Sequence, residues 1–399
     1  MRKLCLRLTL LIALPLLFQF TSPLSHGQYR CPPGQPTHGW PIEPMNQGHP
    51  IGNSFGEFQD HGQCVNSLHC VYQHAGIDIL GTPKYDSIGP NAVLNPSAPW
   101  VLVTVGGTVD EALGAEECNS QDVTDDNRAY YATINGDDGQ IHNYVHLQHC
   151  SYDEGLLSIS NNGGKVTAGS RIAQLVRWIS CDFHHLHYEI IKGNNFMSPL
   201  ACITPHQDGE SPQIVSISFA VNNSGNSSNN WVPLNTVDAQ GCTVVSGQVD
   251  IVADIRDRDS AGSNHVGTKT LWVHNVRWRG CPESNPDCPW NNTYLFDSMP
   301  ITWFSQGNNN ATSAYFSVTK PWESEEDYCL ETPLYAVVTN FVGGTPDKAG
   351  YWDTAKIPNG NYVVSVEATD FAGRTAVSSV NVCVRNNVPP SSPRNLRIQ

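Results

Sequence analysis

The chain has 399 residues and a formal net charge of −15, and only 15% of its residues are charged. That length is enough for two domains and exceeds a typical single core. The acidic balance argues against nucleic acid or another polyanion as a partner. After the first thirty residues, no run is long and apolar enough to span a membrane in the mature form.

The N-terminus has the pattern of a secretory signal. Three basic residues fall among the first seven, an apolar run covers Leu8 to Phe18, and small residues precede the end of the segment at Gly27. This order predicts a signal peptide over residues 1–27 and a secreted or periplasmic mature protein. Of the 13 cysteines, 12 lie beyond the signal. An even number in an exported protein favours disulfides.

Residues 28–49 are rich in Pro, Gly and His without periodicity, and we expect an irregular arm. From about residue 50 the chain changes to short β-prone runs punctuated by Gly-Gly, Asn-Gly and Asp-Gly pairs, which are typical of hairpin turns. No stretch has the pattern of a long amphipathic helix. The prediction is a mainly β, largely antiparallel domain over residues 50–203.

A polar, Pro-bounded segment at 204–212 predicts a linker. Beyond it, alternating runs recur between polar turns, which favours a β-sandwich of immunoglobulin type over residues 213–385. Within it, residues 357–370 resemble the final strands of bacterial immunoglobulin-like modules. Residues 386–399 are Pro-rich, and we expect an extended tail.

Three short segments of the first domain carry candidate metal chemistry. They are His74-Ala-Gly-Ile-Asp78, Tyr144-Val-His146-Leu147 and His185-Leu-His187-Tyr-Glu189. Side chains alternate along a strand, so residues two or four apart share a face. A catalytic zinc takes three nitrogen or oxygen ligands and keeps one open position. Each segment alone is a weak signal, because a lone histidine beside apolar residues is more often structural.

The order and spacing of the three segments resemble the lysostaphin-like zinc endopeptidases. That family includes bacterial peptidoglycan endopeptidases and some secreted elastin-degrading enzymes. The resemblance covers roughly residues 50–203. It implies one zinc ion held by three ligands and two flanking catalytic histidines. By position, the implied ligands are His74, Asp78 and His187, and the implied catalytic residues are His146 and His185.

Other polar residues near the motifs are open to two interpretations. Glu189 shares a strand face with His185 and His187, so it is either an orienting group or a solvated carboxylate. His142 and His149 are either groove residues or surface histidines, and the surface interpretation is favoured. The sequence departs from the family in the segment 178–184 before the His-x-His and in an insertion at about 84–99. Both changes affect the expected substrate groove more than the metal.

These observations predict a secreted zinc metalloendopeptidase that cleaves peptide bonds, with bacterial peptidoglycan as the expected substrate. A protease acting on extracellular protein is the alternative among enzymes. A non-catalytic wall-binding scaffold is the alternative from another class. The oligomeric state is left open.

Two structural expectations follow. Cys281 and Cys288 should form a local disulfide, and Cys181 with Cys202 is proposed to brace the His-x-His strand. Two further pairs, Cys64 with Cys70 and Cys118 with Cys150, are weaker proposals from sequence proximity. Because every candidate site residue precedes residue 190, we expect residues 210–385 to be dispensable for zinc binding and chemistry.

Overall fold

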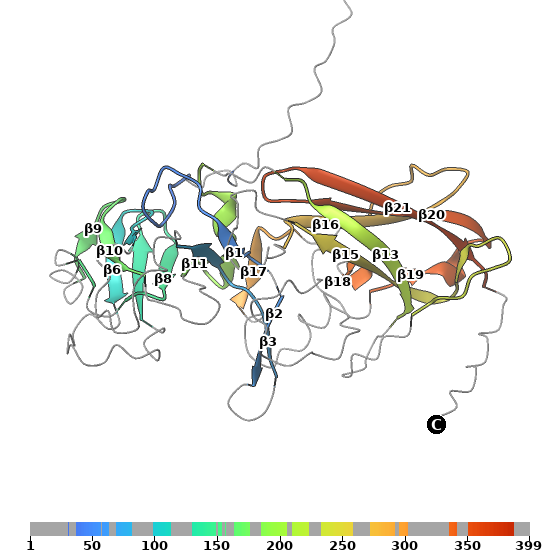
Figure 1. The fold of residues 1–399 in the computed structure, drawn as a ribbon, viewed down its shortest axis with the longest axis horizontal. Coiled ribbons are helices and arrows are strands. Elements are labelled where there is room, and N and C mark those ends of the chain that lie inside the picture. Colours follow the sequence, from blue (N-terminus) through green and yellow to red (C-terminus); the bar gives the residue numbers. More distant parts are fainter. Residues whose placement is uncertain are drawn as a thin grey trace, which may run out of the picture.

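The computed structural model is mainly β, as predicted, with two β-rich halves side by side (Figure 1). None of the helices in the described part of the chain is long and apolar enough to cross a membrane. The structure describes residues 31, 37–56, 58–63, 69–81, 99–112, 130–148, 151–153, 156, 163–175, 185–205, 210–222, 233–257, 272–291, 295–301, 335–340 and 350–386. The predicted signal peptide, most of the Pro-rich tail and His149 lie outside these residues.

The N-terminal half is built on an antiparallel sheet of nine strands. Seven of them run in the order β1, β4, β11, β8, β7, β6 and β9; β12 pairs with the end of β11, and β17 pairs with β12. Their bounds are β1 Ile51–Asn53, β4 Ile77–Leu80, β11 His185–Lys192, β8 Ile141–Val145, β7 Tyr131–Gly136, β6 Gly107–Ala112, β9 Lys165–Val166, β12 Asn195–Met197 and β17 Ser298–Pro300.

Strand β11 lies in the middle of this sheet, and its two faces differ. His187 is opposite Asp78 on β4 and opposite Val145 on β8. The side chains of Leu186, Tyr188 and Ile190 are buried in the core. Since side chains alternate along a strand, the odd-numbered polar residues emerge together on the opposite face.

Two smaller pairs complete this half. Strand β5 (Trp100–Leu102) pairs with β10 (Arg171–Gln174), and β2 (Phe58–Gln63) pairs with β3 (His69–Gln73) as an antiparallel hairpin.

The described strands of the C-terminal half form two sheets. One contains β13 (Gln213–Val221), β15 (Gln248–Arg256), β18 (Tyr335–Val337) and β19 (Trp352–Asp353). The other contains β14 (Thr243–Val245), β21 (Thr375–Val384), β20 (Gly360–Thr369) and β16 (Asn275–Pro282). Side chains from both sheets, including Ile251 and Val364, are fully buried in the core. The immunoglobulin-type topology stays a prediction.

The N-terminal arm is tied to the predicted linker. The backbone N–H of His38 donates to the Cys202 carbonyl at 3.0 Å, and that of Thr204 donates to the His38 carbonyl at 2.9 Å. The indole N–H of Trp40, a buried side chain, donates to the Pro205 carbonyl at 2.7 Å. The described part of the arm, residues 37–49, is therefore irregular in backbone but held in place by hydrogen bonds.

The disulfides confirm one proposed pairing and correct another. Cys281 and Cys288 are bonded to each other, as predicted. The pairing of Cys202 with Cys181 was wrong, because Cys202 is bonded to Cys31. The short 3-10 helix η4 (Pro199–Ala201) turns the chain toward the arm just before Cys202. A third bond joins Cys242 to Cys383. Each of the remaining two proposed pairs includes at least one cysteine outside the described residues, namely Cys64, Cys118 or Cys150.

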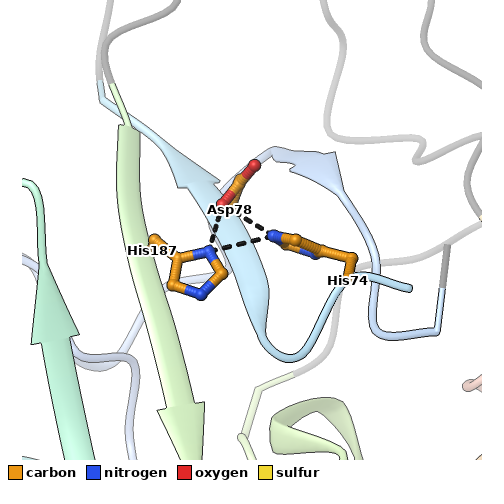
Figure 2. Close-up of side chains that lie close together, drawn as sticks. All are labelled: His74, Asp78 and His187. Carbon is orange, nitrogen blue, oxygen red and sulfur yellow. Dashed lines mark hydrogen bonds and ion pairs between the residues drawn. The ribbon is translucent and has the colours of Figure 1, made fainter. Parts of the chain in front are cut away.

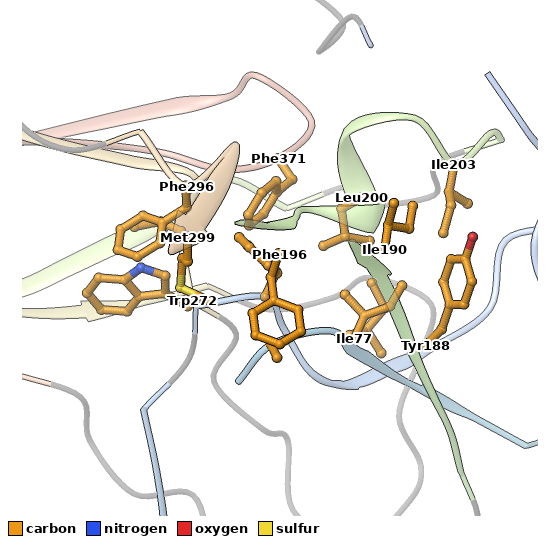
Figure 3. Close-up of a cluster of buried hydrophobic side chains, with 14 of the residues drawn as sticks. Ile77, Tyr188, Ile190, Phe196, Leu200, Ile203, Trp272, Phe296, Met299 and Phe371 are labelled. Carbon is orange, nitrogen blue, oxygen red and sulfur yellow. The ribbon is translucent and has the colours of Figure 1, made fainter. Parts of the chain in front are cut away.

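A buried apolar cluster crosses from one half to the other (Figure 3). Phe196 of β12 is the register partner of Met299 of β17, and both side chains are buried. Trp272 and Phe296, from the C-terminal half, stack edge to face with ring centroids 5.5 Å apart. Because β17 extends the N-terminal sheet, the two halves share backbone hydrogen bonds as well as a core.

Candidate metal centre

The three predicted ligands meet at one point (Figure 2). His74 Nε2 lies 3.1 Å from Asp78 Oδ1 and 2.9 Å from His187 Nδ1, and His187 Nδ1 lies 2.9 Å from the same Asp78 oxygen. His74 precedes β4, Asp78 is on β4, and His187 is on β11 directly opposite. The sheet register thus brings together residues that are more than a hundred positions apart.

The orientation of His74 is set by the backbone. Its Nδ1 lies 3.0 Å from the carbonyl oxygen of Ser54, which can only accept a hydrogen bond. Nδ1 therefore carries the hydrogen, and in the neutral ring Nε2 presents its lone pair to Asp78 and His187. Both His74 and Ser54 are buried, so this orientation is held away from solvent.

Asp78 is buried and remains ionised. Burial alone would raise its pKa, but the nearby charges of His74 and His185 and the hydrogen bonds from His187 and His74 hold the pKa well below its usual range. The side-chain amide of Asn53 donates to the second carboxylate oxygen. One oxygen of Asp78 is thus occupied by Asn53, and the other faces the histidines.

His187 lies between two carboxylates. Its Nδ1 faces Asp78, and its Nε2 lies 2.9 Å from Glu189 Oε1. Burial lowers its pKa, but hydrogen bonds with Asp78 and Glu189 outweigh burial and raise the pKa to about 10. Burial likewise opposes ionisation of Glu189, yet bonding to His187 lowers the pKa of Glu189. The Asn143 amide donates to Glu189 Oε2 at 3.1 Å.

This donor set fits a zinc ion. When His187 is neutral, its one ring hydrogen lies on Nε2 and is donated to Glu189, so that Nδ1 presents a lone pair. Two imidazole lone pairs and one carboxylate oxygen then converge with no hydrogen among them, an arrangement that a cation stabilises. Zn–N and Zn–O bonds of about 2.0–2.2 Å place tetrahedral ligand atoms roughly 3.3 Å apart. The observed separations of 2.9–3.1 Å need only small side-chain rotations to match.

The two predicted catalytic histidines flank this point. The rings of His146 and His185 have centroids 4.7 Å apart, and those of His146 and His187 are 6.0 Å apart. His185 Nε2 lies 3.7 Å from Asp78 Oδ1. Strand alternation from Tyr144 would direct the His146 side chain into the core, but its positive φ of 69° changes the direction of the chain after β8. This backbone conformation is uncommon for a residue other than glycine.

The position of His142 differs from the one favoured by the sequence. It is fully buried, not a surface histidine. Its Nδ1 lies 2.8 Å from the Tyr188 hydroxyl, in a cluster with Thr104 and Tyr144 on the core face of the sheet. Burial raises the pKa of Tyr144 to about 12 and that of Tyr188 well above its usual value. Both phenols therefore remain protonated and can donate.

Sequence patterns missed three supporting residues. Asn53, Ser54 and Asn143 each contact a candidate ligand or its carboxylate partner. Their partners lie 20 to 46 positions away in the chain, so strand spacing alone does not pair these residues with the site. For Glu189, the contact with His187 favours the orienting role over the solvated one.

A second cluster of ligand-type residues contains Asp238, Cys242 and Cys383. Cys242 and Cys383 are joined in a disulfide, so neither offers a thiolate. Among the residues that the structure describes, the centre at His74, Asp78 and His187 is the one with available ligand atoms.

Comparison with known proteins adds little to this description. No family model matches the chain, and no curated protein matches it. Among solved structures, it is similar to the NMR solution structure of lysostaphin, with 13% identity and a TM-score of 0.24, over 54% of this chain and 85% of that one.

Proposed function

We propose that the protein is a secreted zinc metallopeptidase and that His74, Asp78 and His187 bind its single zinc ion. The observation that carries the proposal is the convergence of three ligand atoms from two adjacent strands and the loop before one of them, with two further histidines beside them. Three protein ligands favour a catalytic site, because structural zinc sites usually have four. A bound zinc supplies Lewis acidity and lowers the pKa of a water molecule to about 7.

The protein's own groups account for the proton transfers that peptide hydrolysis requires. His146 and His185 face each other beside the ligands. A neutral imidazole accepts a proton from an attacking water, and an imidazolium donates one to the leaving amine or stabilises an oxyanion. Glu189 keeps the His187 ring oriented through its Nε2 hydrogen. We assign the two proton-transfer roles to His146 and His185 together.

The proposed substrate is the peptide part of bacterial peptidoglycan. Its support is the resemblance of the three sequence motifs to the lysostaphin-like endopeptidases. Three disulfides among the described residues are compatible with an oxidising compartment outside the cytoplasm.

The deciding experiment combines metal content with turnover. Elemental analysis of the purified full chain should show one zinc per molecule, and the protein should release soluble peptide fragments from purified peptidoglycan in a chelator-sensitive reaction. Cleavage of a protein substrate but not of peptidoglycan would favour the extracellular protease. A chain that binds no zinc and releases nothing would leave the non-catalytic scaffold as the explanation.

A further inference from the structure

Ser54 joins the C-terminal half of the chain to a candidate metal ligand. Its carbonyl oxygen accepts the Nδ1 hydrogen of His74 at 3.0 Å. Its hydroxyl oxygen accepts the backbone N–H of Trp272 at 2.6 Å and lies 3.4 Å from the Trp272 carbonyl. All three residues are at most 2% exposed. Ser54 therefore contacts both the His74 imidazole and Trp272, which precedes β16 and lies more than two hundred positions away in the sequence.

A second contact supports the same loop. Gly56 donates its backbone N–H to the His74 carbonyl at 2.9 Å, and it has a positive φ of 78°. A Cβ at this position would lie 2.5 Å from the ring of Phe296, which comes from the C-terminal half. The aromatic ring thus packs directly on the backbone that holds His74.

The sheet itself provides a third connection. Strand β17 pairs with β12, the hairpin partner of the strand that carries His187. The Ser198 N–H also donates to the Asp297 carbonyl at 2.8 Å. Trp272 and Phe296 therefore contact the loop that holds His74, and β17 pairs with the hairpin partner of the strand that carries His187.

We propose that the C-terminal half is a positioning element of the metal centre, and that Ser54 is the residue through which Trp272 fixes the orientation of His74. The inference rests on the proposed zinc site and goes beyond it. A ligand held by a hydrogen-bonded partner binds metal more tightly, because the ring need not be ordered when the ion arrives. Loss of the Trp272 contact should free the Ser54 carbonyl to move, and the His74 ring with it.

The test compares two serines in the full chain. Ser151 makes the same pair of bonds as Ser54, since its hydroxyl donates to the Gln148 carbonyl at 2.7 Å and accepts the Gln174 N–H at 2.8 Å. It is buried in the same half, and its hydroxyl bonds with Gln148 and Gln174 and not with a candidate ligand or its neighbour. Ser54→Ala and Ser151→Ala should therefore lower the melting temperature of the metal-free protein by similar amounts.

Only Ser54→Ala should weaken zinc binding, by about 10- to 100-fold, as is typical when a ligand loses its supporting partner. The dissociation constant is measured by competition with a chromophoric chelator, and the visible spectrum of the cobalt-substituted protein reports the ligand geometry. Equal zinc affinity and equal cobalt spectra in the two variants would refute the inference while leaving the proposed function intact. Absence of zinc from the wild-type protein would refute the proposed function itself.

A second pair of variants covers the case in which Ser54→Ala does not fold. Phe296→Leu removes no group that hydrogen-bonds to Ser54, and it loosens the packing on Gly56 and on the Trp272 ring. Phe219→Leu, at a buried position of β13, is its control. Phe296→Leu should raise the zinc dissociation constant, and Phe219→Leu should leave it unchanged. Identical constants for these two variants would also overturn the inference.

Discussion

His187 has a carboxylate next to each ring nitrogen, Asp78 at Nδ1 and Glu189 at Nε2. Without metal, the imidazolium donates to both, which is why its pKa is raised to about 10. In the proposed zinc site, Nδ1 of His187 would give up its proton and hold the metal ion, while Nε2 would keep its hydrogen for Glu189. The same pair of carboxylates therefore stabilises the protonated ring in the metal-free protein and orients the neutral ring when a metal is bound.

This exchange predicts that zinc affinity depends on pH. Zinc binds the neutral imidazole, and His187 is protonated below about pH 10 in the metal-free protein. Between pH 6 and 8, the association constant should rise by about tenfold per pH unit for this proton. Calorimetry in buffers of different ionisation enthalpy measures the protons released. An affinity that does not change over this range would contradict the proton exchange.

Alanine variants should separate the ligands from the flanking histidines. Replacement of His74, Asp78 or His187 should remove both zinc and activity. Replacement of His146 or His185 should keep zinc and reduce turnover by about 10²- to 10⁴-fold, the typical contribution of general acid–base catalysis. Elemental analysis beside kinetics of all five variants checks this. Full turnover in either flanking variant would show that its proton-transfer role is wrongly assigned.

Strand β11 carries a different polar cluster on each of its two faces. One face carries the candidate metal centre, and the other packs Tyr188 into a buried cluster with Thr104, Tyr144 and His142. The Thr104 hydroxyl lies 2.8 Å from each tyrosine hydroxyl. Because the cluster joins β8, β11 and the segment after β5, we infer that it stabilises the register of the strands that carry the site.

Thr104→Val should therefore destabilise the fold without changing the ligands. Valine has the shape of threonine but removes one hydrogen-bond partner from each of the two buried tyrosine hydroxyls, at a cost of about 1–3 kcal/mol. The free energy of unfolding is measured by urea titration, and zinc content should stay at the wild-type level. Thr369→Val is the control, because Thr369 pairs with Thr375 at an exposed position. Equal stability losses in both variants would contradict a special role for the cluster.

For the whole molecule, the shared sheet changes the expectation that residues 210–385 are dispensable. Strand β17 extends the N-terminal sheet, and Trp272 and Phe296 cover its core. A chain ending near residue 205 would expose apolar side chains such as Phe196. The structure gives a physical reason to expect the opposite result, a weakened zinc site in the shortened chain.

The two disulfides Cys31–Cys202 and Cys281–Cys288 should differ in their contribution to stability. They close loops with sequence separations of 171 and 7 residues. Loop-closure entropy alone predicts stabilisation of about 5 kcal/mol for the long loop and about 2 kcal/mol for the short one. Paired Cys→Ser variants, compared by denaturant unfolding, check this order. A larger loss from the short loop would indicate that native packing outweighs chain entropy.

Several features of the fold could be predicted from short-range regularities in the sequence. Strand alternation placed His185, His187 and Glu189 on one face, because the period of two is a property of the extended backbone. Turn residues and β-prone runs predicted a mainly β chain, and six intervening residues made the Cys281–Cys288 bond geometrically simple. The identity of the ligands as a zinc site stays a prediction.

The remaining features depend on which distant segments meet in the folded chain. Cys202 pairs with Cys31 because the arm returns to the linker, and His142 is buried because the segment after β5 covers β8. Likewise, Trp272 reaches Ser54 because β17 joins the first sheet. None of these contacts follows from local spacing, since each depends on the packing of whole sheets, which minimises exposed apolar surface over the entire molecule.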